Sequence, residues 1–320
     1  MRGKICGTGS YVPMQVYDNH DIAKLVDTND AWIRERTGIV RRHIADGETT
    51  AMMAVKAASA ALENANMEAA ALDLILVATS TSNHVVPGMA CEVQKALGAV
   101  QAAGFDLVAA CSGFVFAYNT AQAYIAAGLY KTVLVIGSEC LSSIVNWEDR
   151  GSCILFGDGA GAVVVCAQEG EPDPCVMHLD GASGSVLACE SRHQKNWQEK
   201  ELAKETLMSM DGKEVFKFAV KKVPEVIHEL LEKTEYTKDD IDWFVLHQAN
   251  QRILESVAKR LRMDMSRIPM NISEYGNTSS ASIPILLDEM NRDGRLKKGQ
   301  KIVLAGFGGG LSWGAALIEW

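Results

Sequence analysis

Three residues of this 320-residue chain combine a reactive side chain with a position that could present it: Cys111, His247 and Asn277. Cys111 follows the apolar stretch "DLVAA" and precedes an uncharged segment that is typical of a helix. At a helix N-terminus the macrodipole and the free backbone N–H groups favour a thiolate, which is the nucleophilic form of cysteine. The alternative is an inert buried thiol, the ordinary role of a free cysteine. Position alone leaves both open.

His247 and Asn277 have weaker individual signals. His247 ends an apolar run in "VLHQAN", and side chains at the carboxyl ends of sheet strands commonly line sites. Asn277 lies in "GNTSSAS", where small neighbours permit a close approach to a ligand. Each has an ordinary alternative, because a lone histidine is more often structural and the asparagine could simply cap a helix.

Two glycine-rich segments add to the candidate chemistry, "FGDGAG" at 156–161 and "GFGGG" at 306–310. Neither ends in Gly-Lys-Ser/Thr as a P-loop does, and neither opens a first βαβ unit as a dinucleotide fingerprint does. We therefore expect tight turns whose backbone N–H groups face a substrate.

Alternating strands and helices must position these residues. Segments rich in Val, Ile and Thr predict strands, some running into turns, at 72–81, 131–139, 160–167, 241–250 and 301–310. Apolar residues at helical spacing predict helices over 49–66 and 224–234. The polar, proline-containing stretch 168–215 joins the two halves of the chain.

The two halves repeat one order of elements. Helix 49–66 and strand 72–81 are echoed by helix 224–234 and strand 241–247. In both halves a turn of small residues then opens a helix, which ends near a glycine and leads into a buried strand. The repeat predicts a duplicated α/β unit whose two helix N-termini face one shared site.

The stretch from Leu107 to Tyr130 carries no charge and is long enough to span a membrane, which takes about 20 apolar residues. Polar and small residues such as Ser112, Gly113 and Asn119 dilute it, and it lacks a strong run of Leu, Ile or Phe. We interpret it as the central helix of a large soluble core.

Composition narrows the class of protein. The formal net charge of −9 argues against nonspecific nucleic-acid binding. No apolar signal segment is recognised at the N-terminus. The eight cysteines include no C-x-x-C pair and no histidine at metal-ligand spacing. We therefore expect reduced thiols of a cytoplasmic protein and no metal site.

Taken together in chain order, these motifs resemble a known family. "AACSGF", "HQAN", "YGNTSSAS" and "GFGGGLSWG" are similar to motifs of the ketoacyl-acyl-carrier-protein synthase III family of condensing enzymes. "GTGSYVP", "DTNDAWIRERTGI", "DRGSCILFGDGAGA" and "MDGKEVFKFAV" extend the resemblance over nearly the whole chain. The resemblance implies an α/β, thiolase-like fold with duplicated halves in αβαβα layers around a buried central helix. Residues 1–170 would carry the cysteine, and 171–320 the histidine and asparagine.

The resemblance implies an acyltransferase that performs a decarboxylative Claisen condensation and so initiates fatty acid biosynthesis. Cys111 would take a short acyl primer from coenzyme A and pass it to a carbanion made by decarboxylating malonyl-acyl carrier protein. The product would be 3-oxoacyl-acyl carrier protein. The backbone N–H groups of Cys111 and Gly309 would form the oxyanion hole, and His247 and Asn277 would stabilise the enolate. No cofactor is implied, because acyl-CoA is a substrate.

The family's coenzyme A contacts map onto this chain as well. Trp32 and Arg150 would stack on the adenine. Further matched positions along the coenzyme A tunnel are Arg36, Thr37, Gly212, Phe216 and Asn250. Without the resemblance, Trp32 would be interpreted as a buried helix anchor.

A local basic cluster in this acidic chain predicts that acyl carrier protein, a strongly acidic partner, docks there. Arg252, Lys259 and Arg260 fall at i, i+7 and i+8 and therefore share one face of a helix. Lys217 lies on the other helix that flanks the expected tunnel mouth. The alternative is an ordinary solvated helix face.

The primer pocket is where the chain departs from the family pattern. Val86, in "HVVPG", stands where some members carry a phenylalanine that lines the pocket across a dimer interface. Beside Phe156 in the same pocket, the smaller valine predicts that a longer or branched primer is admitted. The segment 183–205 matches the pattern poorly, and we expect it to shape the pocket too.

The resemblance implies a cytoplasmic homodimer that binds neither nucleic acid nor membrane. Two other activities compete with the main prediction. A related ketide or quinolone-type condensing enzyme would use malonyl-CoA, and a cysteine thioesterase would use Cys111 and His247 with water as the acceptor. A noncatalytic relative would need to have lost the nucleophile or the enolate pair, and Cys111, His247 and Asn277 are all present.

Overall fold

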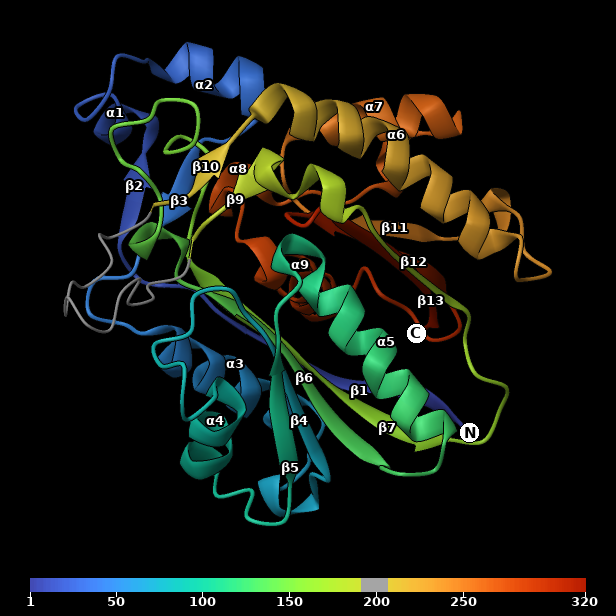
Figure 1. Ribbon diagram of the computed structural model, residues 1–320. Coiled ribbons are helices and arrows are strands. Elements are labelled where there is room, and N and C mark those ends of the chain that lie inside the picture. The colour runs from blue at the N-terminus through green and yellow to red at the C-terminus, as the bar shows by residue number, and fades with distance from the viewer. Residues whose placement is uncertain (191–206) are drawn as a thin grey trace.

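Two β-sheets alternate with three layers of helices in the computed structural model, which describes residues 1–190 and 207–320 (Figure 1). Helices α3 (Thr50–Asn64) and α4 (Met89–Leu97) cover the outer face of the first sheet. Helices α5 (Gly113–Ala126) and α9 (Ser282–Arg292) lie between the sheets. Helix α6 (Gly212–Leu231) covers the second sheet, and α7 (Gln251–Leu261) packs on α6. This is the predicted αβαβα arrangement.

The first sheet has the strand order β1-β7-β6-β4-β5. Its strands are β1 (Arg2–Tyr11), β4 (Leu74–Ala78), β5 (Ala103–Leu107), β6 (Thr132–Glu139) and β7 (Gly159–Gln168). The second sheet has the order β11-β12-β13-β8. Its strands are β8 (Cys175–Leu179), β11 (Trp243–Leu246), β12 (Lys301–Gly308) and β13 (Ser312–Glu319).

The strand orders demonstrate the duplication. The series β1-β7-β6-β4 in one sheet corresponds to β8-β13-β12-β11 in the other. The directions also agree, because β4 and β6 pair in parallel as β11 and β12 do, and the remaining pairs in both series are antiparallel. Strand β5 has no counterpart in the second sheet. The two sheets fall on either side of residue 170, where the sequence analysis divides the halves.

Helix α5 is the predicted central helix, and it is shorter than the uncharged stretch that suggested it. It is buried between the sheets, and its side chains join those of α9 and both sheets in one apolar cluster. Among the described residues no helix is long and apolar enough to cross a membrane.

Strand β6 carries Gly137 where it approaches Ser280, and a Cβ at residue 137 would lie 2.2 Å from the Ser280 carbonyl oxygen. A glycine is therefore required for the loop before α9 to reach this strand.

Helix α6 begins twelve residues before the predicted helix 224–234, at Gly212. The carboxylate of Asp211 caps it by accepting the backbone N–H groups of Lys213 (3.0 Å) and Glu214 (3.1 Å). Pro224 lies inside the helix instead of at its start. The predicted segment 224–234 therefore begins too late and ends three residues beyond Leu231, the last residue of the helix.

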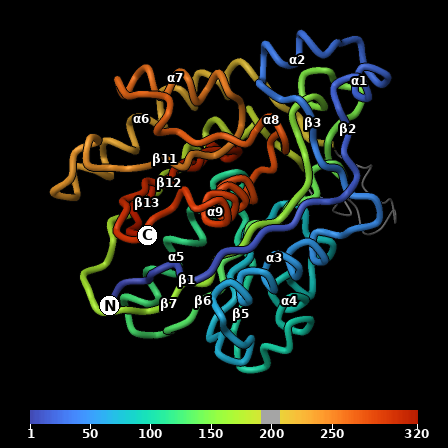
Figure 2. Tube along the Cα trace, turned by 180° about the vertical axis from the view of Figure 1, so that it is seen from behind, coloured from blue at the N-terminus to red at the C-terminus, as the bar shows by residue number. Residues whose placement is uncertain are grey.

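A cap of short elements closes one end of the layers. It contains β2 (Val16–Asp18), α1 (Asn19–Ile22), α2 (Asp30–Thr37), β3 (Arg41–His43), β9 (Leu187–Ala188), β10 (Ser209–Met210) and α8 (Ile272–Tyr275). A small apolar cluster of its own packs beneath it. The N- and C-terminal ends lie close together away from this cap, as Figure 2 shows, and Arg2 donates to the Glu319 carboxylate (3.2 Å).

Two cysteines differ from the predicted reduced thiols. Cys6 and Cys166 form a disulfide between β1 and β7, with their Cα atoms 6.3 Å apart. Cys6 lies at a bulge where the register of β1 shifts between Ile5 and Gly7, and this irregularity brings it beside Cys166. The prediction of reduced cysteines is therefore wrong for this pair.

Candidate active site

One cavity of about 480 Å³ brings together the three reactive residues that the sequence singles out. Cys111 reaches it from the short turn η2 (Ala110–Ser112) that leads into α5. His247 follows the last residue of β11. Asn277 precedes the turn η7 (Ser279–Ala281) that leads into α9. The N-terminal ends of the two central helices thus face one site, as the duplication predicts.

The Cys111 thiol is held in a tight, dry environment. Its side chain belongs to the buried core, with only 8% of the residue exposed. Burial raises the pKa of the thiol to about 12, the charge of Glu139 adds to the rise, and a hydrogen bond from Ser279 opposes it. This desolvation opposes the helix dipole, which by itself would favour the thiolate.

Glycines of the "GFGGG" turn permit the approach to the nucleophile. A Cβ at Gly308 would lie 2.7 Å from the Cys111 backbone nitrogen and 2.9 Å from its Cβ. Gly308 lines the cavity, and Gly309, the predicted oxyanion donor, follows it beside Leu187. The residue before the nucleophile, Ala110, has a φ of 45°, which a residue with a side chain rarely adopts.

His247 is oriented by a serine that sequence reasoning missed. Its Nδ1 lies 2.7 Å from the hydroxyl of Ser282, the first residue of α9. That hydroxyl also accepts the backbone N–H of Gln248 (3.3 Å), and its own proton remains free to be donated to Nδ1. Burial lowers the pKa of His247 to about 3, so the ring is neutral. A neutral ring that accepts at Nδ1 carries its proton on Nε2, and it can donate that hydrogen bond into the cavity.

Asn277 is fixed on both sides by backbone contacts. Its N–H donates to the Leu155 carbonyl (2.8 Å), and its carbonyl accepts from Gly157 (3.1 Å). The side-chain Oδ1 accepts the N–H of Ser279 (2.8 Å), which leaves Nδ2 as the donor end of the amide. Asn277 therefore orients its own side chain in a turn, and it does not cap a helix in the usual sense.

Most of the predicted coenzyme A residues line the same cavity as Cys111. These are Trp32, Arg36, Thr37, Gly212, Phe216 and Asn250. Arg150 is not part of the lining, but its guanidinium lies 5.1 Å from the centre of the Trp32 ring, and that of Arg36 lies 5.2 Å from it. Thr37 and Asn250 use their side chains to bond the backbone, at Ile33 (2.7 Å) and Arg36 (3.0 Å).

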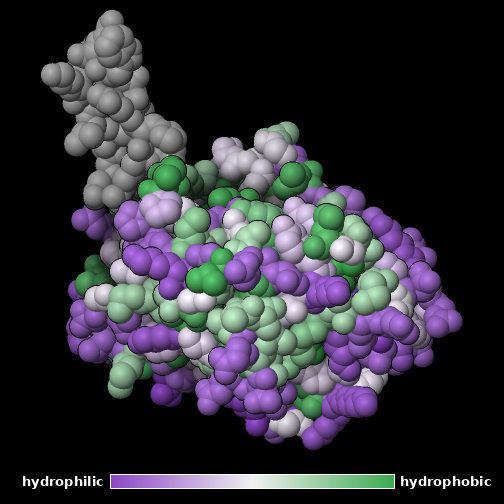
Figure 3. Space-filling model, turned by 90° about the horizontal axis from the view of Figure 1, so that it is seen from below, coloured by the Kyte–Doolittle hydropathy of each residue, from purple (hydrophilic) through white to green (hydrophobic). Residues whose placement is uncertain are grey.

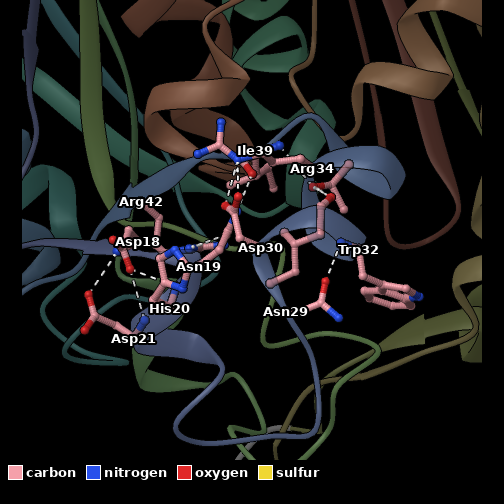
Figure 4. Close-up of polar contacts among 12 residues, drawn as sticks. Asp18, Asn19, His20, Asp21, Asn29, Asp30, Trp32, Arg34, Ile39 and Arg42 are labelled. Atoms are coloured by element: carbon pink, nitrogen blue, oxygen red, sulfur yellow. Dashed lines mark hydrogen bonds and ion pairs between the residues drawn. The ribbon is translucent and has the colours of Figure 1, made fainter.

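A polar network anchors helix α2, which carries Trp32 (Figure 4). The Asn29 side chain accepts the backbone N–H of Trp32 (2.9 Å) and caps the helix. The Asn19 amide donates to Asp30 (2.9 Å), and the buried Arg42 guanidinium donates to Asn19 (3.0 Å). Figure 4 shows the Trp32 ring set apart from these contacts, so the network fixes the helix without using the indole.

The predicted docking residues lie near the cavity mouth and beyond it. Arg252 lines the cavity, with its guanidinium 5.9 Å from the centre of the Phe216 ring. Lys217 pairs with Glu214 (2.7 Å) on the same helix. Lys259 and Arg260 are exposed in the last turn of α7 (Gln251–Leu261).

The two predicted primer-pocket residues are separated in this chain. Phe156 lines the cavity, whereas Val86 is 84% exposed and lies outside the lining. Within the poorly matching segment 183–205, Leu187 lines the cavity. Residues 191–206 lie outside the described part of the chain, so the remainder of that prediction stays untested.

Comparisons with known proteins decide the family. The model described as 3-oxoacyl-[acyl-carrier-protein] synthase III matches residues 105–181, and its C-terminal counterpart matches 231–320. The beta-ketoacyl-[acyl-carrier-protein] synthase III of Clostridium novyi is 50% identical over 320 residues, which cover 99% of this chain and 98% of that one. The chain belongs to this family.

Solved structures of synthase III proteins agree. The protein from Aquifex aeolicus VF5 superposes with a TM-score of 0.92 at 44% identity, covering 99% of this chain and 100% of that one. The protein from Pseudomonas aeruginosa PAO1 superposes with a TM-score of 0.93 at 38% identity, covering 100% of this chain and 98% of that one. Membership in the synthase III family confirms the predicted thiolase-like fold. It also confirms the predicted activity, an acyltransferase whose condensation initiates fatty acid biosynthesis.

Three polar residues of this synthase III site escaped sequence reasoning: Glu139, Ser279 and Ser282. From the sequence, each lies in a segment that predicts only a strand end or a turn of small residues. The role of each side chain depends on contacts with residues that are distant in the chain. Within the described ranges no group of three His, Cys, Asp or Glu side chains is arranged to hold a metal ion. The absence of a cofactor stays a prediction.

Proposed function

We propose that Cys111, His247 and Asn277 divide the condensation between two half-reactions in one cavity. In the first, Cys111 takes an acyl group from acyl-CoA. In the second, malonyl-acyl carrier protein loses carbon dioxide, and its carbanion removes the acyl group as 3-oxoacyl-acyl carrier protein. The observation that carries this proposal is the convergence of all three side chains on the cavity that also contains the predicted coenzyme A residues.

The oxyanion of the first half-reaction is assigned to the backbone N–H groups of Cys111 and Gly309. The 2.7 Å approach of a Gly308 Cβ to the Cys111 nitrogen supports this assignment, since only glycine leaves room for an oxygen atom there. In the second half-reaction negative charge develops on the malonyl thioester oxygen. The Nε2–H of His247 and the Nδ2 of Asn277 are two fixed donors for it, and one such donor is worth about 2.7–4 kcal/mol.

Coenzyme A is assigned to the outer part of the cavity. The indole of Trp32, with guanidiniums of Arg36 and Arg150 about 5 Å away, offers a stacking surface for adenine and positive charge for phosphates.

Replacing Trp32 by alanine is expected to raise KM for acyl-CoA about tenfold, because the stacking surface is lost. The kcat for condensation should change little, since the reacting atoms are remote. Steady-state kinetics with varied acyl-CoA would measure both. Trp32→Phe is the matched control and should retain most of the affinity. An unchanged KM in Trp32→Ala would contradict the adenine assignment.

Acyl carrier protein is assigned to the basic residues of α6 and α7, namely Lys217, Arg252, Lys259 and Arg260. Arg252 at the cavity mouth and the exposed pair Lys259 and Arg260 support this assignment. The salt pair of Lys217 with Glu214 weakens its individual contribution.

The double variant Lys259→Glu/Arg260→Glu is expected to lower kcat/KM for malonyl-acyl carrier protein roughly tenfold, through repulsion of an acidic partner. Acylation by acyl-CoA should be unchanged, and the loss should shrink at high salt. Lys297→Glu/Lys298→Glu, an exposed adjacent pair before β12, is the matched control. If both double variants lower kcat/KM for malonyl-acyl carrier protein equally, the effect comes from net charge and the docking assignment fails.

A cytoplasmic homodimer is the proposed working form. Strand β5 is an edge of the first sheet, and apolar side chains are exposed on it and beside it, including Val86 at 84% and Val108 at 77%. Figure 3 views the molecule from the end where α4 and β5 lie in Figure 1, and it shows hydrophobic residues gathered across the middle of that end. A second copy seated there would cover this surface, and Val86 would contribute to the partner's primer pocket. Analytical ultracentrifugation tests the dimer.

Intact-protein mass spectrometry tests the proposed function directly. The enzyme is mixed with acetyl-, isobutyryl- and longer acyl-CoAs, and malonyl-acyl carrier protein is then added. An adduct on Cys111 that only the malonyl partner discharges is the expected result, and the acyl group retained identifies the primer. Acceptance of acetyl-CoA alone would contradict the role given to Val86.

The competing functions are separate outcomes of the same experiment. An adduct cleared by water without condensed product would identify a thioesterase. Discharge by malonyl-CoA as readily as by malonyl-acyl carrier protein would favour a ketide-type condensing enzyme. No adduct from any acyl-CoA would indicate a binding protein.

A further inference from the structure

A fully buried carboxylate lies next to the nucleophile and has no part in the mechanism so far. Glu139 is the last residue of β6 and is 0% exposed. One oxygen, Oε2, accepts from the Thr81 hydroxyl (2.7 Å), the Ser80 N–H (3.1 Å) and the Thr79 hydroxyl (3.5 Å). These donors hold the carboxylate in one orientation and direct the other oxygen, Oε1, toward the loop before α9.

Oε1 accepts from two neighbouring serines of that loop. The Ser279 hydroxyl lies 3.2 Å from it and the Ser280 hydroxyl 3.1 Å. Ser280 also donates to the Ala78 carbonyl (3.0 Å), whereas Ser279 is the side chain whose hydroxyl lowers the pKa of the Cys111 thiol. Ser279 has a φ of 50°, an unfavourable backbone conformation for serine, in the turn where its hydroxyl reaches the Glu139 carboxylate. One hydroxyl therefore connects nucleophile and carboxylate.

We propose that Glu139 is the proton acceptor for Cys111 and that Ser279 transmits the proton between them. As the Cys111 sulfur attacks the acyl-CoA carbonyl carbon, its proton passes to the Ser279 oxygen while the Ser279 proton passes to Oε1. The bond from carbon to the coenzyme A sulfur then breaks, and the departing thiolate takes a proton from solvent. Glu139 keeps its proton while Cys111 is acylated. When the carbanion displaces Cys111, the leaving thiolate regains that proton through Ser279.

Charge conservation explains why a buried carboxylate suits this role. A thiolate formed beside an ionised Glu139 would place two negative charges in a dry site, where each is strongly disfavoured. Transfer through Ser279 moves one charge from oxygen to sulfur and adds none. The hydrogen bond of Ser279 then stabilises the thiolate, which is the direction of its effect on the pKa of Cys111.

Basicity also favours Glu139 over His247 as the acceptor. Burial raises the pKa of Glu139 to about 7 and lowers that of His247 to about 3. A general base is most effective when its pKa lies near the working pH, so the carboxylate is the better matched group. Cys140, the next residue after Glu139, is a neutral thiol with its pKa raised to about 11 by burial, and it contacts Asp158 on its other side. Glu139 is the charged group that acts on Cys111.

The test is single-turnover acylation by acyl-CoA, followed by intact mass, and it rests on the proposed function. Ser279→Ala and Glu139→Gln should slow acylation about 100-fold, a typical contribution of one general base. Ser280→Ala is the matched control, because it removes the same kind of hydrogen bond from the same Oε1 without touching Cys111, and it should cost less than about threefold. The double variant Glu139→Gln/Ser279→Ala should be no slower than either single variant, since the two act as a unit.

The pH profile provides a readout that a merely structural role would not change. Wild-type acylation should lose rate as the pH falls through about 7, because a protonated Glu139 cannot accept the proton. In Glu139→Gln that limb should vanish. Thermal unfolding of each variant checks folding, and the Ser279/Ser280 pair remains decisive if Glu139→Gln does not fold.

Equal slowing by Ser279→Ala and Ser280→Ala, or an unchanged acid limb in Glu139→Gln, would overturn the proposal. Failure of the proposed function is distinguishable, because in that case the wild-type enzyme itself would form no acyl adduct.

Discussion

Replacing Cys111 by alanine is expected to abolish the acyl adduct and to lower condensation at least roughly 10⁴-fold. The reason is that Cys111 is the only thiol among the described residues that line the cavity shared by His247 and Asn277. Decarboxylation should persist, because both enolate donors remain. Malonyl-acyl carrier protein should therefore release carbon dioxide without forming 3-oxoacyl product. Intact mass and labelled carbon dioxide measure the two results on one sample.

Cys175→Ser is the matched control, since Cys175 is a partly exposed thiol on β8 outside the cavity lining. It should acylate and condense like the wild-type enzyme. An adduct that survives in Cys111→Ala, mapped to another residue, would show that the nucleophile has been misassigned. Condensation without any adduct would show that the primer is transferred directly, with no acyl-enzyme.

The architecture was predictable because duplication leaves a pattern in sequence. Both halves place a helix, a buried strand and a small-residue turn in the same order, and that order became two sheets with matching strand series. The boundaries of individual helices and the disulfide were harder to predict from the sequence. The start of α6 depends on a cap by Asp211, and the disulfide depends on a one-residue bulge at Cys6. Neither contact changes the hydrophobic pattern from which elements are predicted.

The part of the site that could be predicted from the sequence is the part whose residue types are themselves distinctive. Cysteine, histidine and asparagine are recognisable because few residues perform their chemistry. Ser279, Ser282 and Glu139 are not, because a serine in a small-residue turn and a glutamate at a strand end are common everywhere. The protonation state of Cys111 was also beyond the sequence. A helix N-terminus favours a thiolate, whereas the burial that opposes it is a property of the packed core and leaves no mark in the sequence.

Replacing His247 by alanine is expected to separate the half-reactions. Acylation of Cys111 should remain near the wild-type rate, while discharge by malonyl-acyl carrier protein should slow roughly 10²–10³-fold, the usual loss for one donor to a developing oxyanion. Since burial lowers the pKa of His247 to about 3, the ring stays a neutral donor across the range of about pH 5 to 8 in which ordinary histidines titrate. The wild-type discharge rate should therefore show no inflection from His247 there.

His228→Ala, at an exposed position on α6, is the matched control and should leave both rates unchanged. Rapid-quench mass spectrometry measures the two steps separately, and Asn277→Ala should reproduce the selective loss in discharge. Equal losses in acylation and discharge would give His247 a different role, as the base that activates Cys111. That outcome would also remove the need for Glu139 as a proton acceptor, because one cavity would then contain a conventional cysteine–histidine pair.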